Sequence, residues 1–269
     1  MIGLEGANVC VTGGARGIGR ATVAELTRRG ATVWIGDRDL AAAQETALAL
    51  GAHAHYLDVT DEAGFREFLG AASERAPIDM LVNNAGIQLM GRFVDHDLAA
   101  LRRELAINLG AVLTGTHLVL PDMIRRGRGH IVNVSSMAGK VTTPGIATYC
   151  ASKFGVVALS RAVRAELAGT GVTLTTVMPA ATRTDLTAGV LLRLQPTLAP
   201  ETVAAAIIDS AGHGRGEVTV PRYLAPIGLL EEIIPAQIMW HLKRFVGGAD
   251  YGAFDPVGRQ AYLERTRWS

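Results

Sequence analysis

The sequence predicts an α/β protein built on a doubly wound parallel sheet of about seven strands, with helices on both faces. Short apolar runs rich in Val and Ile alternate with longer helical patterns over most of the chain. Strands that are apolar throughout indicate a sheet buried on both faces, and each connection between parallel neighbours needs a helix. A glycine cluster after the first apolar run is typical of the turn that opens such a fold.

Each expected element can be placed by residue number. The expected strands are residues 7–12, 32–36, 53–58, 80–83, 130–135, 173–178 and 217–220, and the expected helices are residues 17–29, 40–50, 62–75, 98–126, 147–168 and 200–211. No linker, repeat or low-complexity stretch interrupts residues 1–222, so we expect them to form one domain. Residues 223–269 carry an apolar stretch broken by Pro226 and Pro235, and we expect them to form a C-terminal extension.

Composition and charge argue against several classes of function. Charged residues make up 19% of the chain and the formal net charge is +1, so a nucleic-acid partner is not expected. Cys10 and Cys150 form no CxxC pair and the histidines are scattered, so neither a disulfide framework nor a metal site is expected. The chain shows no signal-peptide pattern, and no uninterrupted apolar run reaches the ~20 residues of a membrane-spanning helix. A reducing cytoplasm is the expected location.

The glycine cluster reads TGGARGIG over residues 12–19, at the junction of the first expected strand and helix. Glycines there let the backbone approach a pyrophosphate, and the helix N-terminus offers free N–H groups and a positive dipole end. This is the fingerprint of a dinucleotide-binding Rossmann fold, although a glycine turn also arises for steric reasons alone. The expected contacts in this loop are Gly13, Ala15, Arg16, Gly17, Ile18 and Gly19.

An acidic residue supports a dinucleotide and bears on which one. Asp37 ends the second expected strand, 20 residues beyond Gly17, where this fold places an acid on the adenosine ribose. A carboxylate accepts hydrogen bonds from a 2′-hydroxyl and repels a 2′-phosphate, which favours NAD over NADP. Arg16 and Arg38 leave NADP open, because either could pair with a phosphate; both could equally be solvated surface charges.

A tyrosine and a lysine are expected on one face of a helix. Tyr149 and Lys153 are four residues apart near the start of the helix expected at 147–168. A nearby cation stabilises a phenolate, so such a tyrosine can exchange a proton with an alcohol or a ketone. Ser136 follows the strand expected at 130–135 and could hydrogen-bond the substrate oxygen. YxxxK alone is a common chance match, but chance explains the ordered combination poorly.

With these motifs in place, the chain resembles the short-chain dehydrogenase/reductase superfamily over roughly residues 5 to 222. The matching pieces, in chain order, are the TGGARGIG loop, Asp58-Val59, Asn83-Asn84-Ala85-Gly86, Asn108, the set Ser136, Tyr149 and Lys153, and Pro179 with Thr184. The resemblance implies a dinucleotide-binding and catalytic domain at 1–222. It also implies a homodimer or homotetramer that pairs through the long helices expected at 98–126 and 147–168.

The resemblance further implies a role for each matching position. Asp58 and Val59 would contact adenine, and Asn84, Ala85 and Gly86 would line the cofactor. Asn108 would hold a water that connects Lys153 to solvent, and Lys153 and Tyr149 would both contact the cofactor. Pro179, Thr182 and Thr184 would lie at the nicotinamide end. Two departures affect that last contact: Ala180 stands where glycine is usual, and Thr182 where an aliphatic residue is frequent.

The expected substrate is a lipophilic secondary alcohol or ketone, similar to a steroid or a lipid. Apolar residues follow the expected strand ends: Leu89, Met90, Phe93, residues 141–144, and several leucines within residues 183–199. The extension either packs on the parent domain or a sister subunit, or covers a greasy substrate, or rests on a membrane with Lys243 and Arg244 at its edge.

The sequence therefore favours an NAD-dependent oxidoreductase that transfers hydride between nicotinamide and an alcohol or carbonyl carbon. One alternative is an NADPH-dependent carbonyl reductase. Another is a non-catalytic NAD-binding sensor, although such a protein commonly loses the acid–base residues that are present here.

Overall fold

Seven parallel strands form the sheet of the computed structural model, which describes residues 2–187, 197–235, 237–239, 241, 255, 258–260, 262 and 264. The strands are β1 (Asn8–Thr12), β2 (Thr32–Asp37), β3 (His53–Tyr56), β4 (Met80–Asn83), β5 (Gly129–Val134), β6 (Val172–Pro179) and β7 (Glu217–Val220). Their spatial order is β3-β2-β1-β4-β5-β6-β7. The direction of winding reverses between β1 and β4, which is where doubly wound sheets bind ligands. The predicted fold class is confirmed.

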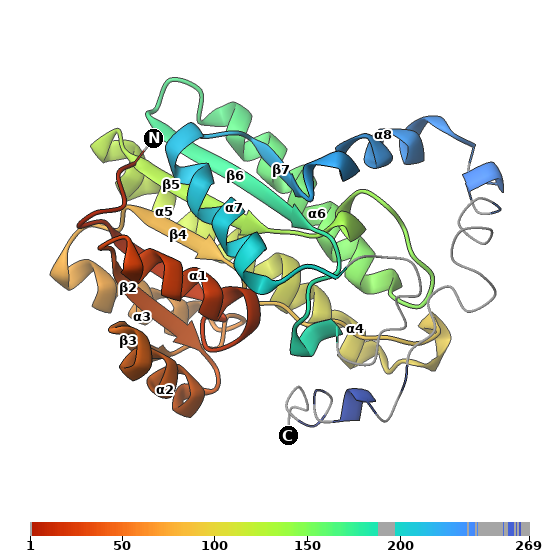
Figure 1. Cartoon of the computed structure of the whole chain (residues 1–269), viewed down its shortest axis with the longest axis horizontal. Coiled ribbons are helices and arrows are strands. Elements are labelled where there is room, and N and C mark those ends of the chain that lie inside the picture. Colours follow the sequence, from red (N-terminus) through yellow and green to blue (C-terminus); the bar gives the residue numbers. More distant parts are fainter. Residues whose placement is uncertain are drawn as a thin grey trace.

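Helices cover both faces of the sheet, as Figure 1 shows. They are α1 (Gly17–Arg28), α2 (Leu40–Leu50), α3 (Glu62–Arg75), α4 (Leu98–Leu105), α5 (Ala111–Arg126), α6 (Ala147–Glu166), α7 (Pro200–His213) and α8 (Ala225–Ile233). Helices α1, α2 and α7 pack on one face, and α3, α5 and α6 pack on the other. Helix α8 projects from the end of β7.

Strand β1 shows why the central strands are apolar throughout. Val9 and Val11 belong to the core beneath α1 and α7. Cys10, between them, points to the opposite face and packs in the core that contains Phe65 and Phe68 of α3. Successive side chains of a strand alternate between faces, so a strand covered on both sides needs an apolar residue at every position.

The long helix expected at 98–126 is not uniform. A π-helical turn, η2 (Ala106–Gly110), separates α4 from α5 and carries Asn108. π turns of this kind insert an extra residue and are frequent at functional sites. The whole stretch Leu98–Arg126 is long and apolar enough to cross a membrane, but 44% of its most apolar window is buried inside the fold, and the core helix of a soluble protein meets the same criterion.

The strand expected at 53–58 ends earlier, at Tyr56. The physical reason lies in Asp58, whose Oδ1 accepts hydrogen bonds from the N–H of Thr60 (2.9 Å) and from its hydroxyl (2.7 Å). This local turn directs the chain out of the sheet. The other expected strand and helix ends agree with the structure to within two residues.

We predict that His130 makes the fold sensitive to acid. Its ring lies buried in β5, with Nδ1 2.8 Å from Thr173 Oγ1 and Nε2 2.9 Å from Ser210 Oγ. Burial lowers the pKa of His130 from 6.5 to about 4. Between pH 6.5 and 4 the unfolded chain therefore binds a proton at this histidine that the folded chain does not bind. The free energy of unfolding falls as the pH drops through that window. The loss across that window should approach about 3 kcal/mol.

Urea denaturation at several pH values measures this effect. The variant His130→Gln, which keeps hydrogen-bonding groups but cannot titrate, should lose less stability than the wild type over the same window. Parallel curves for the two proteins would contradict the assignment.

Candidate active site

The glycine loop between β1 and α1 forms a backbone cradle that side chains would fill. Gly13 has φ +64° and Gly17 has φ +53°, which glycine adopts at the least cost. A Cβ at position 19 would lie 2.1 Å from the carbonyl oxygen of Gly13. Arg16, at the N-cap of α1, makes no side-chain capping bond to the first turn. The N-terminus of α1 therefore presents backbone N–H groups suited to an anion such as a pyrophosphate.

A second loop locks this cradle in place. The hydroxyl of Thr12 accepts hydrogen bonds from the N–H groups of Asn84 (3.0 Å) and Ala85 (3.1 Å). In return, Nδ2 of Asn84 donates to the carbonyl oxygens of Thr12 and Gly13, at 3.0 Å each. The loops after β1 and β4 are thus joined across the point where the strand order reverses, which brings Asn84 and Ala85 to the cradle as the sequence predicts.

Asp37 lies at the end of β2 and holds the neighbouring backbone. Its two carboxylate oxygens accept the N–H of Ala15 and the N–H of Asp39, both at 3.1 Å. Burial raises the pKa of Asp37, while these two hydrogen bonds and the charge of Arg16 act against the increase. Arg16 itself pairs with Asp39 at 2.8 Å, and Arg38 is half-buried beside them. Two carboxylates, Asp37 and Asp39, thus lie at the end of β2, and Arg16 is already paired with one of them.

Three polar groups converge at the start of α6. Tyr149 and Lys153 are 7% and 4% exposed, and Nζ of Lys153 lies 5.6 Å from the centre of the Tyr149 ring. Ser136, just beyond β5, hydrogen-bonds the Tyr149 hydroxyl. Lys153 donates from Nζ to the carbonyl oxygen of Val134 at 3.0 Å. The fold thus brings together the hydroxyl, phenol and ammonium that the sequence predicts would meet.

The charge states of this cluster depend mainly on burial. Burial raises the pKa of Tyr149, and the hydrogen bond from Ser136 opposes that rise. Burial also lowers the pKa of Lys153 to about 8, which the negative charge of Glu104 opposes. The lowering expected from a nearby cation does not decide the pKa of Tyr149: desolvation is the main effect, and the opposing effect comes from Ser136.

Asn108 fixes the segment that follows β4. Its Oδ1 accepts the N–H of Ile87 and its Nδ2 donates to the carbonyl oxygen of the same residue, both at 2.8 Å. Nδ2 also lies 3.2 Å from Ser152 Oγ on α6. Gly86 sits directly against the cluster, because a Cβ there would be 3.2 Å from Asn108 Oδ1 and 3.7 Å from Lys153 Nζ.

The remaining predicted residues lie along the same sheet edge. Asp58 and Val59 follow β3, and Val59 packs partly on the core under α3. Pro179 ends β6, and Thr182 is buried in the loop beyond it. Thr184 reaches the glycine loop, because its Cγ2 would lie 3.1 Å from a Cβ at Gly17. Of the substrate loop expected at 183–199, residues 188–196 lie outside the described residues.

Sequence reasoning missed four residues at the site. Thr12 belongs to the glycine motif but was not expected to hold Asn84. Glu104 is fully buried on α4 beside the cluster, and Arg259 and Tyr262 of the C-terminal segment hydrogen-bond the loop after β4. The spacing of four between Glu104 and Asn108 was an available signal, because residues four apart share a helix face.

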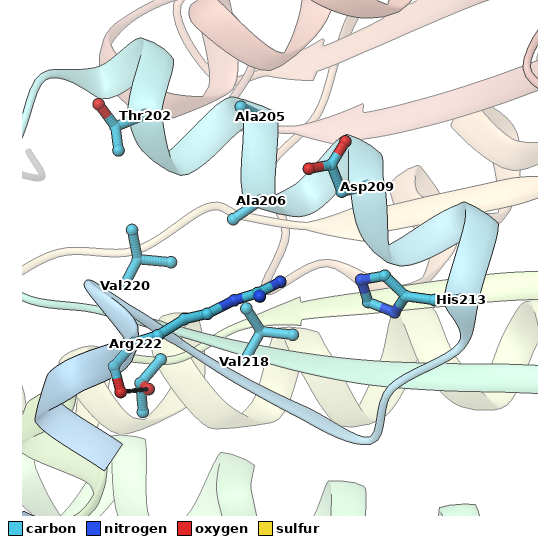
Figure 2. Close-up of a pocket in the computed structure, with 9 residues that line it drawn as sticks. Thr202, Ala205, Ala206, Asp209, His213, Val218, Val220 and Arg222 are labelled. Atoms are coloured by element: carbon cyan, nitrogen blue, oxygen red, sulfur yellow. Dashed lines mark hydrogen bonds between the residues drawn. The ribbon is translucent and has the colours of Figure 1, made fainter.

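A separate cavity of about 260 Å³ lies between α7 and β7 (Figure 2). Asp209 and His213 line it from α7, and the exposed Arg222 extends into it from the segment after β7. Its lining residues include none of the predicted site residues. Among the described residues, no group of three or more His, Cys, Asp or Glu side chains is placed to hold a metal ion.

Comparison with known proteins identifies the family. A family model described as short chain dehydrogenase matches residues 7–193. The chain belongs to the short-chain dehydrogenase family. Members of this family are oxidoreductases that act on alcohol and ketone groups, so the predicted enzyme class is confirmed at the level of the family.

Two relatives are similar to this chain over different shares of its length. It is 40% identical over 187 residues to "Probable oxidoreductase EphD" of Mycobacterium tuberculosis, an alignment that covers 67% of this chain and 32% of that protein. The chain thus spans about a third of the length of that relative. Mouse estradiol 17-beta-dehydrogenase 11 is 32% identical over 250 residues, covering 89% of this chain and 84% of that one.

A solved structure shows the same fold. A short-chain dehydrogenase/reductase from Burkholderia phymatum, crystallised in complex with NAD, superposes with a TM-score of 0.79 at 23% sequence identity. The match covers 90% of this chain and 97% of that chain.

We predict that Gly19→Ala weakens dinucleotide binding roughly tenfold or more, because the new methyl group collides with the Gly13 carbonyl and distorts the cradle. Gly70→Ala is the matched control, since a Cβ at that helical position meets no atom of the described part of the chain within 4 Å. Titration of each protein with NADH, followed by fluorescence, measures the dissociation constants. Equal affinity in a folded Gly19→Ala protein would exclude the loop as the binding site.

Proposed function

We propose that this protein is an NAD-dependent dehydrogenase or reductase that transfers hydride between nicotinamide and a secondary alcohol or ketone. The observation that carries the proposal is the convergence of Ser136, Tyr149 and Lys153 at the carboxyl edge of the sheet, next to Gly86. Family membership supports the same reaction class.

Each of the three side chains has a role that its contacts suit. Tyr149 acts as the general acid or base, because its phenol exchanges the proton of the substrate oxygen as hydride moves. Ser136 hydrogen-bonds that phenol and stabilises the charge that develops on the substrate oxygen. Lys153 supplies the positive charge that favours phenolate and binds the nicotinamide ribose. Asn108 holds the loop beside them and the water that links Lys153 to solvent.

NAD supplies the hydride acceptor, and the chain offers a site that fits it. The cradle of Gly13, Gly17 and Gly19 suits the pyrophosphate, because the absence of side chains lets the backbone approach it closely. A Cβ at Gly19 would collide with the carbonyl oxygen of Gly13. Ala15, Ile18, Ala85 and Thr184 flank that cradle, while Asp58 and Val59 lie towards the adenine. Pro179 and Thr182 lie at the nicotinamide end.

The acids at the end of β2 favour NAD over NADP. Asp37 places a carboxylate where a 2′-phosphate would need a cation. Arg16, which could have served as that cation, already pairs with Asp39 at 2.8 Å. The NADPH-dependent alternative then depends on Arg38.

A lipophilic substrate suits the apolar side chains that follow β4. Phe93 and Leu98 are large apolar side chains that stay exposed beyond β4, at 59% and 55%. A relative that spans most of this chain is named as an estradiol dehydrogenase, which adds support for a steroid- or lipid-like alcohol. Exposed apolar surface also leaves a peripheral membrane contact as part of the proposal.

The assembly and the extension remain predictions. We expect residues 1–222 to act as the catalytic domain in a cytoplasmic homodimer or homotetramer, and Leu105, Leu113 and Ile124 present exposed apolar surface on the long helices expected to pair. Residues 223–269 are proposed to pack on the same domain. Hydrogen bonds from Arg259 to Leu186 and Gln88 support that placement.

The first test is Tyr149→Phe. Removal of one oxygen should lower turnover of a lipophilic secondary alcohol on the order of 100- to 10,000-fold, because general acid–base catalysis is lost. The affinity for NADH should stay within about twofold, since the ring still packs. Nicotinamide absorbance at 340 nm follows turnover. Activity equal to the wild type would remove Tyr149 from the mechanism.

The second test concerns cofactor choice. Wild-type protein should bind NADH more tightly than NADPH, and Asp37→Ser should reduce that preference because the repelling carboxylate is gone while an acceptor remains. Isothermal titration calorimetry gives both dissociation constants for each protein. A wild-type preference for NADPH would overturn the role assigned to Asp37.

A further inference from the structure

A buried carboxylate lies next to the catalytic cluster and has no part in the mechanism described above. Glu104, in the last turn of α4, is 0% exposed. Its Oε1 accepts the N–H of Leu89 at 2.9 Å, whereas its Oε2 is buried and has no hydrogen-bond partner among the residues that the structure describes. An acid buried this completely is costly unless nearby charges offset the loss of water, so its surroundings are informative.

Charges on two other elements interact with Glu104. The ammonium of Lys153, from α6, and the guanidinium of Arg259, from the C-terminal segment, both favour its charged form. Burial outweighs them and raises the pKa of Glu104 to about 7. In the reverse direction, the charge of Glu104 raises the pKa of both Lys153 and Tyr149. Tyr262 and Cys150 also raise the pKa of Tyr149.

The backbone between Glu104 and the cluster is clamped from two sides. Asn108 and Glu104 bind Ile87 and Leu89 from the helix side. From the other side, the hydroxyl of Tyr262 accepts the N–H of Gln88 at 2.8 Å, and Arg259 donates to the Gln88 carbonyl oxygen.

Arg259 ties a second loop to the same place. It is only 1% exposed, lies over the Tyr262 ring at 4.4 Å, and donates from a second nitrogen to the carbonyl oxygen of Leu186 at 2.9 Å. It thereby joins the loop after β4 to the loop after β6. Both loops leave the carboxyl edge of the sheet where the cluster lies.

We propose that Glu104 is a positioning residue whose buried charge sets the proton affinity of the Tyr149–Lys153 pair, and that Arg259 couples the C-terminal segment to this chemistry by controlling the charge of Glu104. The proposal rests on the proposed function. In this proposal the charge of Arg259 acts on Glu104, and the charge of Glu104 acts on Lys153. Arg259 then influences catalysis without touching the reacting atoms.

The test separates the charge of Glu104 from its hydrogen bond. Glu104→Gln keeps an acceptor for Leu89 but removes the charge, so Tyr149 and Lys153 release their protons more easily. The rising limb of log kcat/KM against pH for alcohol oxidation should move to lower pH by about one unit, a roughly tenfold rate change on that limb. Glu104→Asp keeps the charge and should leave the limb near its wild-type position. An unmoved limb in Glu104→Gln would reduce Glu104 to a structural role.

Arg259→Met tests the coupling. Without the guanidinium, the pKa of Glu104 rises and more of it is neutral, so the limb should move in the same direction as in Glu104→Gln. In the Glu104→Gln background the same substitution should add no further shift, because the group through which it acts is gone. A shift to higher pH, or a full additional shift in the double variant, would overturn the coupling.

A titration that needs no turnover distinguishes failure of this inference from failure of the proposed function. In protein labelled with ¹³C at glutamate carboxyl carbons, the resonance absent from Glu104→Gln should titrate with a midpoint near 7. A midpoint at or below about 5.5, nearer the usual glutamate value, would leave Glu104 charged with or without the guanidinium, and it would overturn the control by Arg259 even if Tyr149→Phe behaves as expected.

Discussion

The burial of one ammonium group constrains the whole active site. Lys153 has lost nearly all contact with water, and charged side chains tolerate that only where polar groups and opposite charge replace it. The Val134 carbonyl oxygen and the carboxyl of Glu104 provide the replacement. Because those groups come from β5 and α4, the buried lysine keeps its charge only where both elements are packed against α6. The same packing sets the tyrosine one turn away.

The segment Gly86–Leu89 transmits that constraint to the rest of the site. It begins at the loop that holds the glycine cradle and continues across the helix that carries Glu104 and Asn108. Side chains satisfy the N–H and C=O groups of Ile87 and Gln88 and the N–H of Leu89, and buried backbone groups need such partners where regular secondary structure does not supply them. A loop held in this way can keep the cofactor cradle and the acid–base pair at a fixed distance from each other. Its Gln88 is also bonded by Tyr262 and Arg259 of the C-terminal segment.

Much of this arrangement could be predicted from the sequence because it depends on local patterns. The glycine spacing, Asp37 at a strand end and the interval between Tyr149 and Lys153 each report geometry within a few residues. Glu104 was harder to place: its spacing of four from Asn108 was a signal, but it follows Arg102 and Arg103 and resembles part of a solvated charged face. The π turn at Asn108 and the return of Arg259 to the site arise from contacts between distant segments, which periodicity does not encode.

The distance between the Tyr149 hydroxyl oxygen and C4 of the nicotinamide ring tests the central claim most directly. A crystal structure of the protein with NAD measures it. We expect the two atoms to face each other across a gap that one carbon–oxygen group of a substrate fills. Lys153 should donate a hydrogen bond to the nicotinamide ribose. A ring bound far from Tyr149, with the lysine side chain turned away, would contradict the assignment of this cluster as the catalytic centre.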